Sequence, residues 1–78
     1  MEPRPLTIVT YDLELITSEG EVTETLEISY DSEMYDEDRD GADMMFINLK
    51  MTEMKEKYGD DVFLLGYSIG REQQGGLH

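Results

Sequence analysis

Two stretches near the start of the chain alternate between apolar and polar residues. This period of two is typical of strands that bury one face and expose the other. Residues 6–16 and 21–30 both follow it and are rich in β-branched and aromatic types, so each is predicted to be a strand. The apolar set is Val9, Tyr11, Leu13 and Leu15 in the first stretch, and Val22, Leu26, Ile28 and Tyr30 in the second.

Residues 18–20, Ser-Glu-Gly, have the composition of a turn, so the two strands should form a hairpin. A register that pairs apolar residues places Leu13 opposite Leu26. The same register places Asp12 opposite Glu27 on the other face. Because like charges directly opposed are unfavourable, that face must be open to water or must bind something cationic.

A change to a spacing of three and four residues predicts a helix that starts after Asp40 and ends before Gly59. Asp40 is a suitable N-cap, Asp43 is placed as an acid of the first turn, and Gly59 is placed as a C′ residue. The stripe expected to face the sheet consists of Met44, Ile47, Met51, Met54 and Tyr58.

Residues 62–69 form a nearly continuous apolar run, which favours a strand buried on both faces. The predicted fold class is therefore α+β, β-β-α-β, with a three-stranded antiparallel or mixed sheet in the order 2-1-3 and one helix packed on one face. One helix leaves the other face uncovered, which suggests a homodimer through the back of the sheet or a partner that docks there. The apolar residues expected there are Leu6, Ile8, Ile16, Val62 and Leu64.

Length and composition predict a single small acidic domain over residues 1–78. We expect an extended lead over residues 1–5, a folded core over 6–69 and a flexible tail over 70–78. The chain has no cysteine, and it contains no apolar run of the length of a signal peptide or a membrane span. These features favour a cytoplasmic protein that does not contact a membrane.

The formal net charge of −13 is unevenly distributed. Thirteen of the 19 acidic residues lie between Asp12 and Asp43, where Arg39 is the only basic residue, whereas the rest of the chain is nearly neutral. A localised field of one sign favours attraction to a basic protein surface. It disfavours direct binding of nucleic acid, which needs clustered Lys and Arg.

Asp36, Asp38 and Asp40 followed by Gly41 match the first half of a calcium loop. The twelfth position of that loop is Ile47, where an EF-hand has a bidentate Glu, so a calcium site would need a further carboxylate such as Asp31 or Glu33. No cofactor other than Ca²⁺ is suggested. Catalysis is not expected, because the single histidine, His78, is the last residue and no phosphate-binding glycine motif occurs.

The function indicated by these patterns is that of a non-catalytic binding protein, an acidic inhibitor or adaptor. In size and charge alone the chain resembles phage-type nucleic-acid mimics, which occupy the basic surface of a nucleic-acid-binding protein. The alternatives are a small calcium-binding module and a dimeric structural accessory protein. The residues expected to contact a partner are Asp12, Glu14, Glu27, Asp31, Glu33, Tyr35, Asp36, Glu37 and Asp38.

Overall fold

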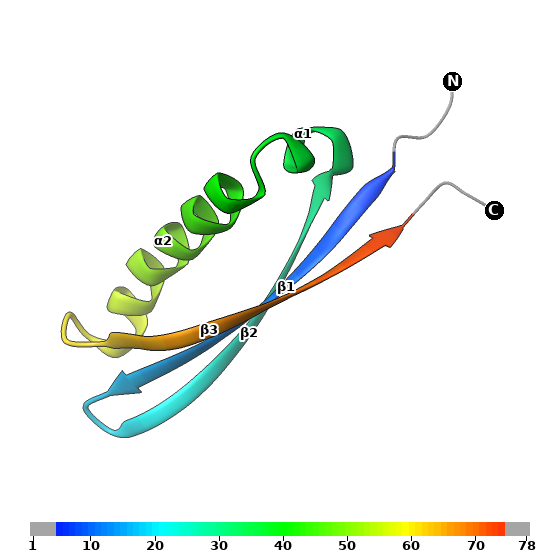
Figure 1. Ribbon diagram of the computed structural model, residues 1–78. Coiled ribbons are helices and arrows are strands. Elements are labelled where there is room, and N and C mark those ends of the chain that lie inside the picture. Colours follow the sequence, from blue (N-terminus) through cyan, green and yellow to red (C-terminus); the bar gives the residue numbers. More distant parts are fainter. Residues whose placement is uncertain (1–4, 75–78) are drawn as a thin grey trace.

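The computed structural model describes residues 5–74, which form two layers, a twisted sheet and a helical layer on one of its faces (Figure 1). A hairpin comes first, followed by two consecutive helices and a return strand. The elements are β1 (Leu6–Thr17), β2 (Gly20–Asp31), α1 (Ser32–Glu37), α2 (Arg39–Tyr58) and β3 (Phe63–Gln74).

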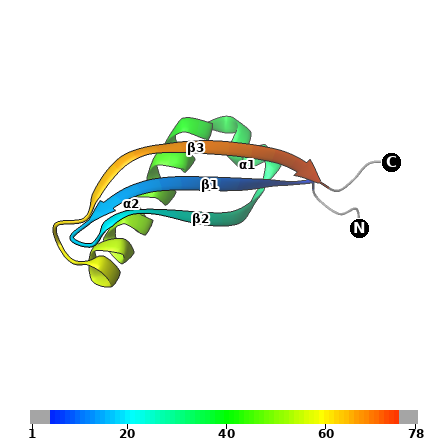
Figure 2. The same cartoon turned by 90° about the horizontal axis from the view of Figure 1, so that it is seen from below.

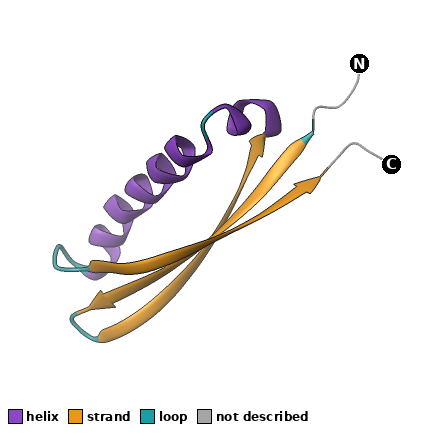
Figure 3. Cartoon of the chain, in the orientation of Figure 1, coloured by secondary structure: helices purple, strands orange, loops and turns teal. Residues whose placement is uncertain are grey.

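The sheet has three strands in the order β2-β1-β3, and β1 pairs antiparallel with both neighbours. α2 runs along one face of this sheet, and both helices lie on that same side (Figures 2 and 3). The predicted α+β architecture and strand order are confirmed. Within the described residues, no helix is long and apolar enough to cross a membrane.

The core lies between α2 and the face of the sheet that carries the odd-numbered residues of β1. Four β1 side chains in this layer, Val9, Tyr11, Leu13 and Leu15, have no exposed surface. They are buried because the strand is central in the sheet and its alternation places all four on the helix side. The other buried apolar residues are Tyr35, Phe46, Ile47, Met54 and Val62.

The predicted register of the hairpin is wrong by two residues. Tyr11 lies opposite Leu26, and Asp12 lies opposite Thr25 instead of Glu27. The reason is the loop, which contains only two residues because Thr17 pairs directly with Gly20. Gly20 has a φ of 120°, a conformation that a residue with a side chain rarely adopts, and this makes the shorter loop possible.

The segment between the second strand and α2, for which the sequence indicates no helix, contains the short helix α1. Asp31 caps this helix, and its carboxylate accepts hydrogen bonds from the backbone N–H groups of Glu33 and Met34. The helix turns Tyr35 inward, where its side chain is only 1% exposed. Tyr35 is therefore part of the core, and the prediction that it contacts a partner is not supported by its position.

α2 begins two residues earlier than predicted, and most of its predicted stripe faces the core: Ile47 and Met54 are buried, and Met51 and Tyr58 pack against the core. Asp38, not Asp40, is its N-cap, and the Asp38 carboxylate accepts the backbone N–H of Gly41. Asp43 does not form a capping box, because it is buried against the sheet. Phe46 is in the core, whereas Met44 is 38% exposed.

β3 is longer and more exposed than predicted. It begins at Phe63 and continues to Gln74, so residues 70–74 of the expected flexible tail belong to the sheet. Residues 75–78 of that tail lie outside the described residues. The strand is not buried on both faces, because Phe63 is 62% exposed and Leu65 51% exposed.

The two β3 residues predicted for the uncovered face lie on the other side. Val62 is buried just before the strand, and Leu64 packs against the core. A shift in the pairing between Glu14 and Leu15 of β1 inserts one extra residue into β3 and changes which residues face the helix.

Candidate functional site

The face of the sheet opposite α2 has an excess of carboxylates. The even-numbered residues of β1 and the odd-numbered residues of β2 point to this side, since the residues between them face the core. The pairing of β3 with β1 adds residues around Gly70 to the same surface. We call this surface the acidic face, and its carboxylates are those of Asp12, Glu14, Glu21, Glu27 and Glu72.

The basic side chains of the described residues lie on the other side of the sheet. Three lysines are in α2, and Arg39 pairs with Asp36 at a distance of 3.0 Å beside the start of that helix. Arg71 reaches from β3 toward the helical layer, where its Nη2 lies 2.8 Å from Asp43 Oδ2. The positive charges are thus concentrated in the helical layer, and the acidic face keeps a negative field.

A hollow of about 230 Å³ interrupts the acidic face near its centre. Glu27 of β2, Thr10 of β1 and Gly70 of β3 form one row across the sheet. A side chain built on Gly70 would meet nothing within 4 Å, so the missing side chain leaves this space open. The lining residues are Ile8, Thr10, Glu27, Gly70, Arg71 and Glu72.

Two carboxylates, of Glu27 and Glu72, border this hollow from opposite edge strands. Arg71 also contributes to the lining, but its guanidinium is hydrogen-bonded on the other side of the sheet. The hollow has the size and charge to accept the ammonium or guanidinium group of a protein side chain.

A buried polar cluster under α2 joins two strands of the sheet to both helices through Asp43, which is 2% exposed. Its Oδ1 accepts hydrogen bonds from the hydroxyl of Tyr11 at 2.6 Å and of Tyr35 at 2.7 Å. Its Oδ2 accepts from Arg71 Nη2 at 2.8 Å, and Arg71 Nε donates to the Tyr35 hydroxyl at 2.7 Å. The cluster therefore ties β1, α1, α2 and β3 together.

The hydrogen bonds of this cluster keep Asp43 ionised. Burial by itself would raise the pKa of Asp43, but donation from Tyr11, Tyr35 and Arg71 outweighs burial and holds that pKa below its usual value. Burial raises the pKa of Tyr11, as does its hydrogen bond to Asp43, so this tyrosine stays a neutral donor. Since every group has a partner, the cluster is suited to stability and not to acid-base chemistry.

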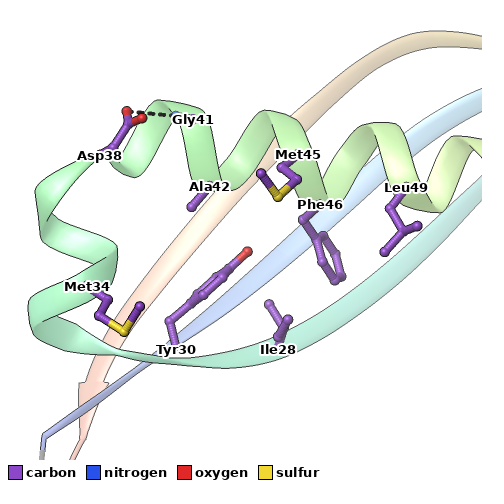
Figure 4. A pocket seen from close by; sticks show the side chains of 9 residues that line it. All are labelled: Ile28, Tyr30, Met34, Asp38, Gly41, Ala42, Met45, Phe46 and Leu49. Carbon is purple, nitrogen blue, oxygen red and sulfur yellow. Dashed lines mark hydrogen bonds between the residues drawn. The ribbon is translucent and has the colours of Figure 1, made fainter.

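An apolar groove of about 460 Å³ lies between α2 and the edge strand β2 (Figure 4). Three side chains on its rim are strongly exposed for apolar residues: Met34 at 70%, Met45 at 73% and Leu49 at 58%. Figure 4 shows these three side chains around those of Tyr30 and Phe46. The remaining lining residues are Ile28, Tyr30, Asp38, Gly41, Ala42 and Phe46.

The wall of the groove is held in place by the buried cluster. The ring of Tyr30 stacks on Tyr35 with centroids 4.6 Å apart, and the ring of Phe46 stacks on Tyr11 at the same distance. The Tyr30 hydroxyl also lies 3.0 Å from that of Tyr11. Because Tyr11 and Tyr35 both donate to Asp43, the groove rests on groups with fixed positions.

The structure separates the acidic residues that the sequence groups together. Asp12, Glu14 and Glu27 share the acidic face, where the Asp12 carboxylate accepts a hydrogen bond from Thr25 at 2.7 Å. The acids around α1 lie at the end of the helical layer instead, and several have structural partners there. These are Asp31, Glu33, Asp36, Glu37 and Asp38.

The residues of the calcium-type loop are distributed over two helices. Asp36 is in α1 and pairs with Arg39, Asp38 caps α2, and Asp40 is in the first turn of α2. Within residues 5–74, no three acidic, histidine or cysteine side chains form a group that could hold a metal ion.

Sequence reasoning missed several residues that shape these surfaces. The sequence predicts Asp43 as an acid of the first helical turn, although its spacing of three from Phe46 is that of the buried side. Gly70 and Glu72 fall in the predicted tail, although the alternation that continues through Ser68, Gly70 and Glu72 is a signal for a longer strand.

No protein-family model matches this chain, and no curated protein or solved structure is significantly similar to it. The fold places it among α+β proteins with a three-stranded antiparallel sheet.

Proposed function

We propose that this protein is a non-catalytic inhibitor or adaptor whose acidic face binds a basic surface of another protein, of the kind that binds nucleic acid. The observation that supports this function best is the charge of the acidic face. Five carboxylates lie there, and the described Lys and Arg side chains are in or directed toward the helical layer. Such a surface attracts a basic partner from a distance and disfavours wrong partners.

The spacing of these carboxylates suits the imitation of a nucleic-acid backbone. Asp12 and Glu14 are two residues apart on one strand, which separates them by about 7 Å along the strand. This is about twice the rise of about 3.4 Å per phosphate along one DNA strand. Along the helix axis, the two carboxylates therefore match alternate phosphates of one strand, in sign and approximately in spacing.

The hollow supplies a place for one basic side chain at the centre of the interface. An Arg or Lys from the partner would lie between Glu27 and Glu72 and would make charge-assisted hydrogen bonds. A homodimer through this face is less favourable, since it would oppose the same five carboxylates in two copies.

Charge reversal on the acidic face, compared with the same reversal elsewhere on the surface, tests the proposal. An oligoarginine peptide serves as the probe, with fluorescence anisotropy as the measurement. Glu14→Lys with Glu27→Lys should weaken binding at least about tenfold, because both side chains are exposed on the acidic face. The control, Glu56→Lys with Asp60→Lys, makes the same change in net charge at exposed positions outside that face and should have an effect below about threefold. Equal losses in the two variants would contradict the proposal.

Filling the hollow tests the central contact separately. Gly70→Val should weaken binding of the same peptide without loss of stability, since the new side chain enters open space. Gly66→Val places the same side chain on the acidic face outside the hollow and is the control.

The nucleic-acid part of the proposal requires that the protein displace a fluorescent DNA duplex from sequence-independent DNA-binding proteins, and that the displacement weaken as salt rises.

A further inference from the structure

We propose that the free edge of β2 and the apolar groove beside it together form a docking site for an extended segment of a partner protein, in which apolar and basic residues alternate. The segment adds to the sheet as a fourth strand next to β2. Its apolar side chains enter the groove under α2, and its basic side chains lie beside the acidic face. The basic half of this pattern rests on the proposed function, whereas the apolar half rests on the groove alone.

The edge of β2 is available for pairing. β2 is the outer strand of the sheet, and within the described residues it pairs only with β1. An edge strand leaves alternate backbone N–H and C=O groups without a partner in the sheet, and these groups can pair with an added strand. In a hairpin with a two-residue loop, the residues that flank the loop, Thr17 and Gly20, bond to each other. The odd-numbered residues of β2, such as Thr25, Glu27 and Ser29, therefore direct their backbone groups outward.

The groove lies next to this edge and faces the same incoming strand. Ile28 and Tyr30 of β2 form part of its lining, and both belong to the side of the strand that faces α2. An added strand continues the pleat, so its side chains on that side would contact Met45 and Leu49. These flexible and exposed apolar side chains are suited to adapt to a partner.

At the opposite edge of the sheet, side chains of the described part of β3 fill the corresponding space. On the β3 side, the space under α2 is occupied by Arg71, which bonds to Asp43, and by Tyr67, whose hydroxyl lies 3.8 Å from the sulfur of Met44. The residues that line the groove come from β2 and the helices, and none of them is in β3. A partner strand therefore has apolar burial available at β2 and not at β3.

Charge selects the residues on the other side of the added strand. These side chains would lie beside Glu21 and Glu27, which β2 directs to the acidic face. Cross-strand pairs of opposite charge stabilise a sheet, whereas like charges destabilise it. An alternating sequence of Lys or Arg with Leu or Val satisfies both faces at once.

A synthetic peptide of about ten residues, the upper end of usual strand lengths, in which Lys alternates with Leu tests the site. Titration should slow hydrogen exchange at the backbone amides of Thr25, Glu27 and Ser29, because these N–H groups acquire acceptors. A peptide of the same composition in scrambled order should bind at least about tenfold more weakly, as should one N-methylated at alternate residues, which lacks the backbone donors. Protection of these amides only by the unmodified alternating peptide supports the proposal.

Two matched variants separate the groove from general apolar contact. Leu49→Ser should weaken the alternating peptide at least about tenfold, whereas Leu65→Ser, on β3, should leave its affinity within about twofold. The two leucines have similar exposure, 58% and 51%. Folding of each variant is checked by circular dichroism.

A bound peptide that is helical, or N-methylation without effect, would overturn the strand-addition proposal and leave the acidic-face proposal standing. If the acidic-face variant and its control bind oligoarginine equally, while the alternating peptide still protects the β2 amides, the acidic-face proposal fails and the strand-addition proposal stands.

Discussion

At the scale of single residues, the most informative side chain is Asp43. It is a carboxylate in the middle of the core, and it persists there because three donors surround it: Tyr11, Tyr35 and Arg71. In the part of the chain that the structure describes, every buried side-chain polar atom has a partner. The satisfied cluster fixes the two aromatic rings that form the wall of the groove, so one buried acid affects the shape of an external surface.

Removal of this acid should strongly destabilise the protein. Asp43→Ala leaves two tyrosine hydroxyls and a guanidinium without their acceptor and should lower the free energy of unfolding by about 2–4 kcal/mol. The estimate is below that for a fully buried charge pair because the Arg71 side chain is 36% exposed. Urea unfolding measures the change. Asp40→Ala, an exposed acid three residues earlier on the same helix, should cost less than about 0.5 kcal/mol. Similar losses in both variants would contradict the role of the cluster.

At the scale of elements, the helical layer depends on how its two helices begin. Each starts with an aspartate whose side chain accepts backbone N–H groups, Asp31 for α1 and Asp38 for α2. The second cap requires a glycine nearby, because a Cβ on Gly41 would lie 2.2 Å from Asp38 Oδ2. The glycine within α2 is thus explained by its close approach to the capping side chain and not by flexibility.

This explanation predicts non-additive substitutions. Gly41→Ala by itself should give little stabilisation, since the gain in helix propensity of about 1 kcal/mol is offset by loss of a cap of about the same value. In an Asp38→Ala background, where the cap is already absent, Gly41→Ala should stabilise by about 1 kcal/mol. A double-mutant cycle in urea measures the coupling. If Gly41→Ala has the same effect in both backgrounds, the steric argument is wrong.

At the scale of the whole molecule, the net charge of −13 and the two lowered pKa values act in opposite directions as pH falls. Repulsion among the acids destabilises the folded state at neutral pH, and protonation relieves it. The hydrogen bonds of Lys57 and Tyr58 lower the pKa of Glu24, and the donors around Asp43 lower its pKa. A lowered folded-state pKa means that the stabilisation is present above the unfolded-state pKa and is lost as pH falls through the folded value.

The thermal midpoint should therefore pass through a shallow maximum near about pH 5 and fall below about pH 4, the range of unfolded-state carboxyl pKa values. Circular dichroism melts between pH 3 and pH 8 measure this profile. At high salt the change between pH 7 and pH 5 should flatten, because exposed repulsion is screened, whereas the loss at low pH should remain. A midpoint that rises steadily down to pH 3 would exclude a stabilising role for the ionised Asp43 and Glu24.

The sequence by itself determined the classes of element and their order. Alternation in residues 6–16 and 21–30 was sufficient for the hairpin, because burial on one face imposes a period of two on any strand. The order 2-1-3 followed from the rules of chain connection. The excess of acids in the first half was also evident, as composition needs no structure.

Only the tertiary structure decided the register, the burial of Asp43 and Phe46 on the inward side of α2, and the division of the acids into surfaces. A shift of two residues keeps every side chain on its face, so the pattern alone did not distinguish Leu26 from Glu24 opposite Leu13. The burial of Asp43 and Tyr35 depends on Arg71, which is distant in sequence and adjacent in space. The groove exists because one helix covers three strands incompletely, and this depends on how the layers pack.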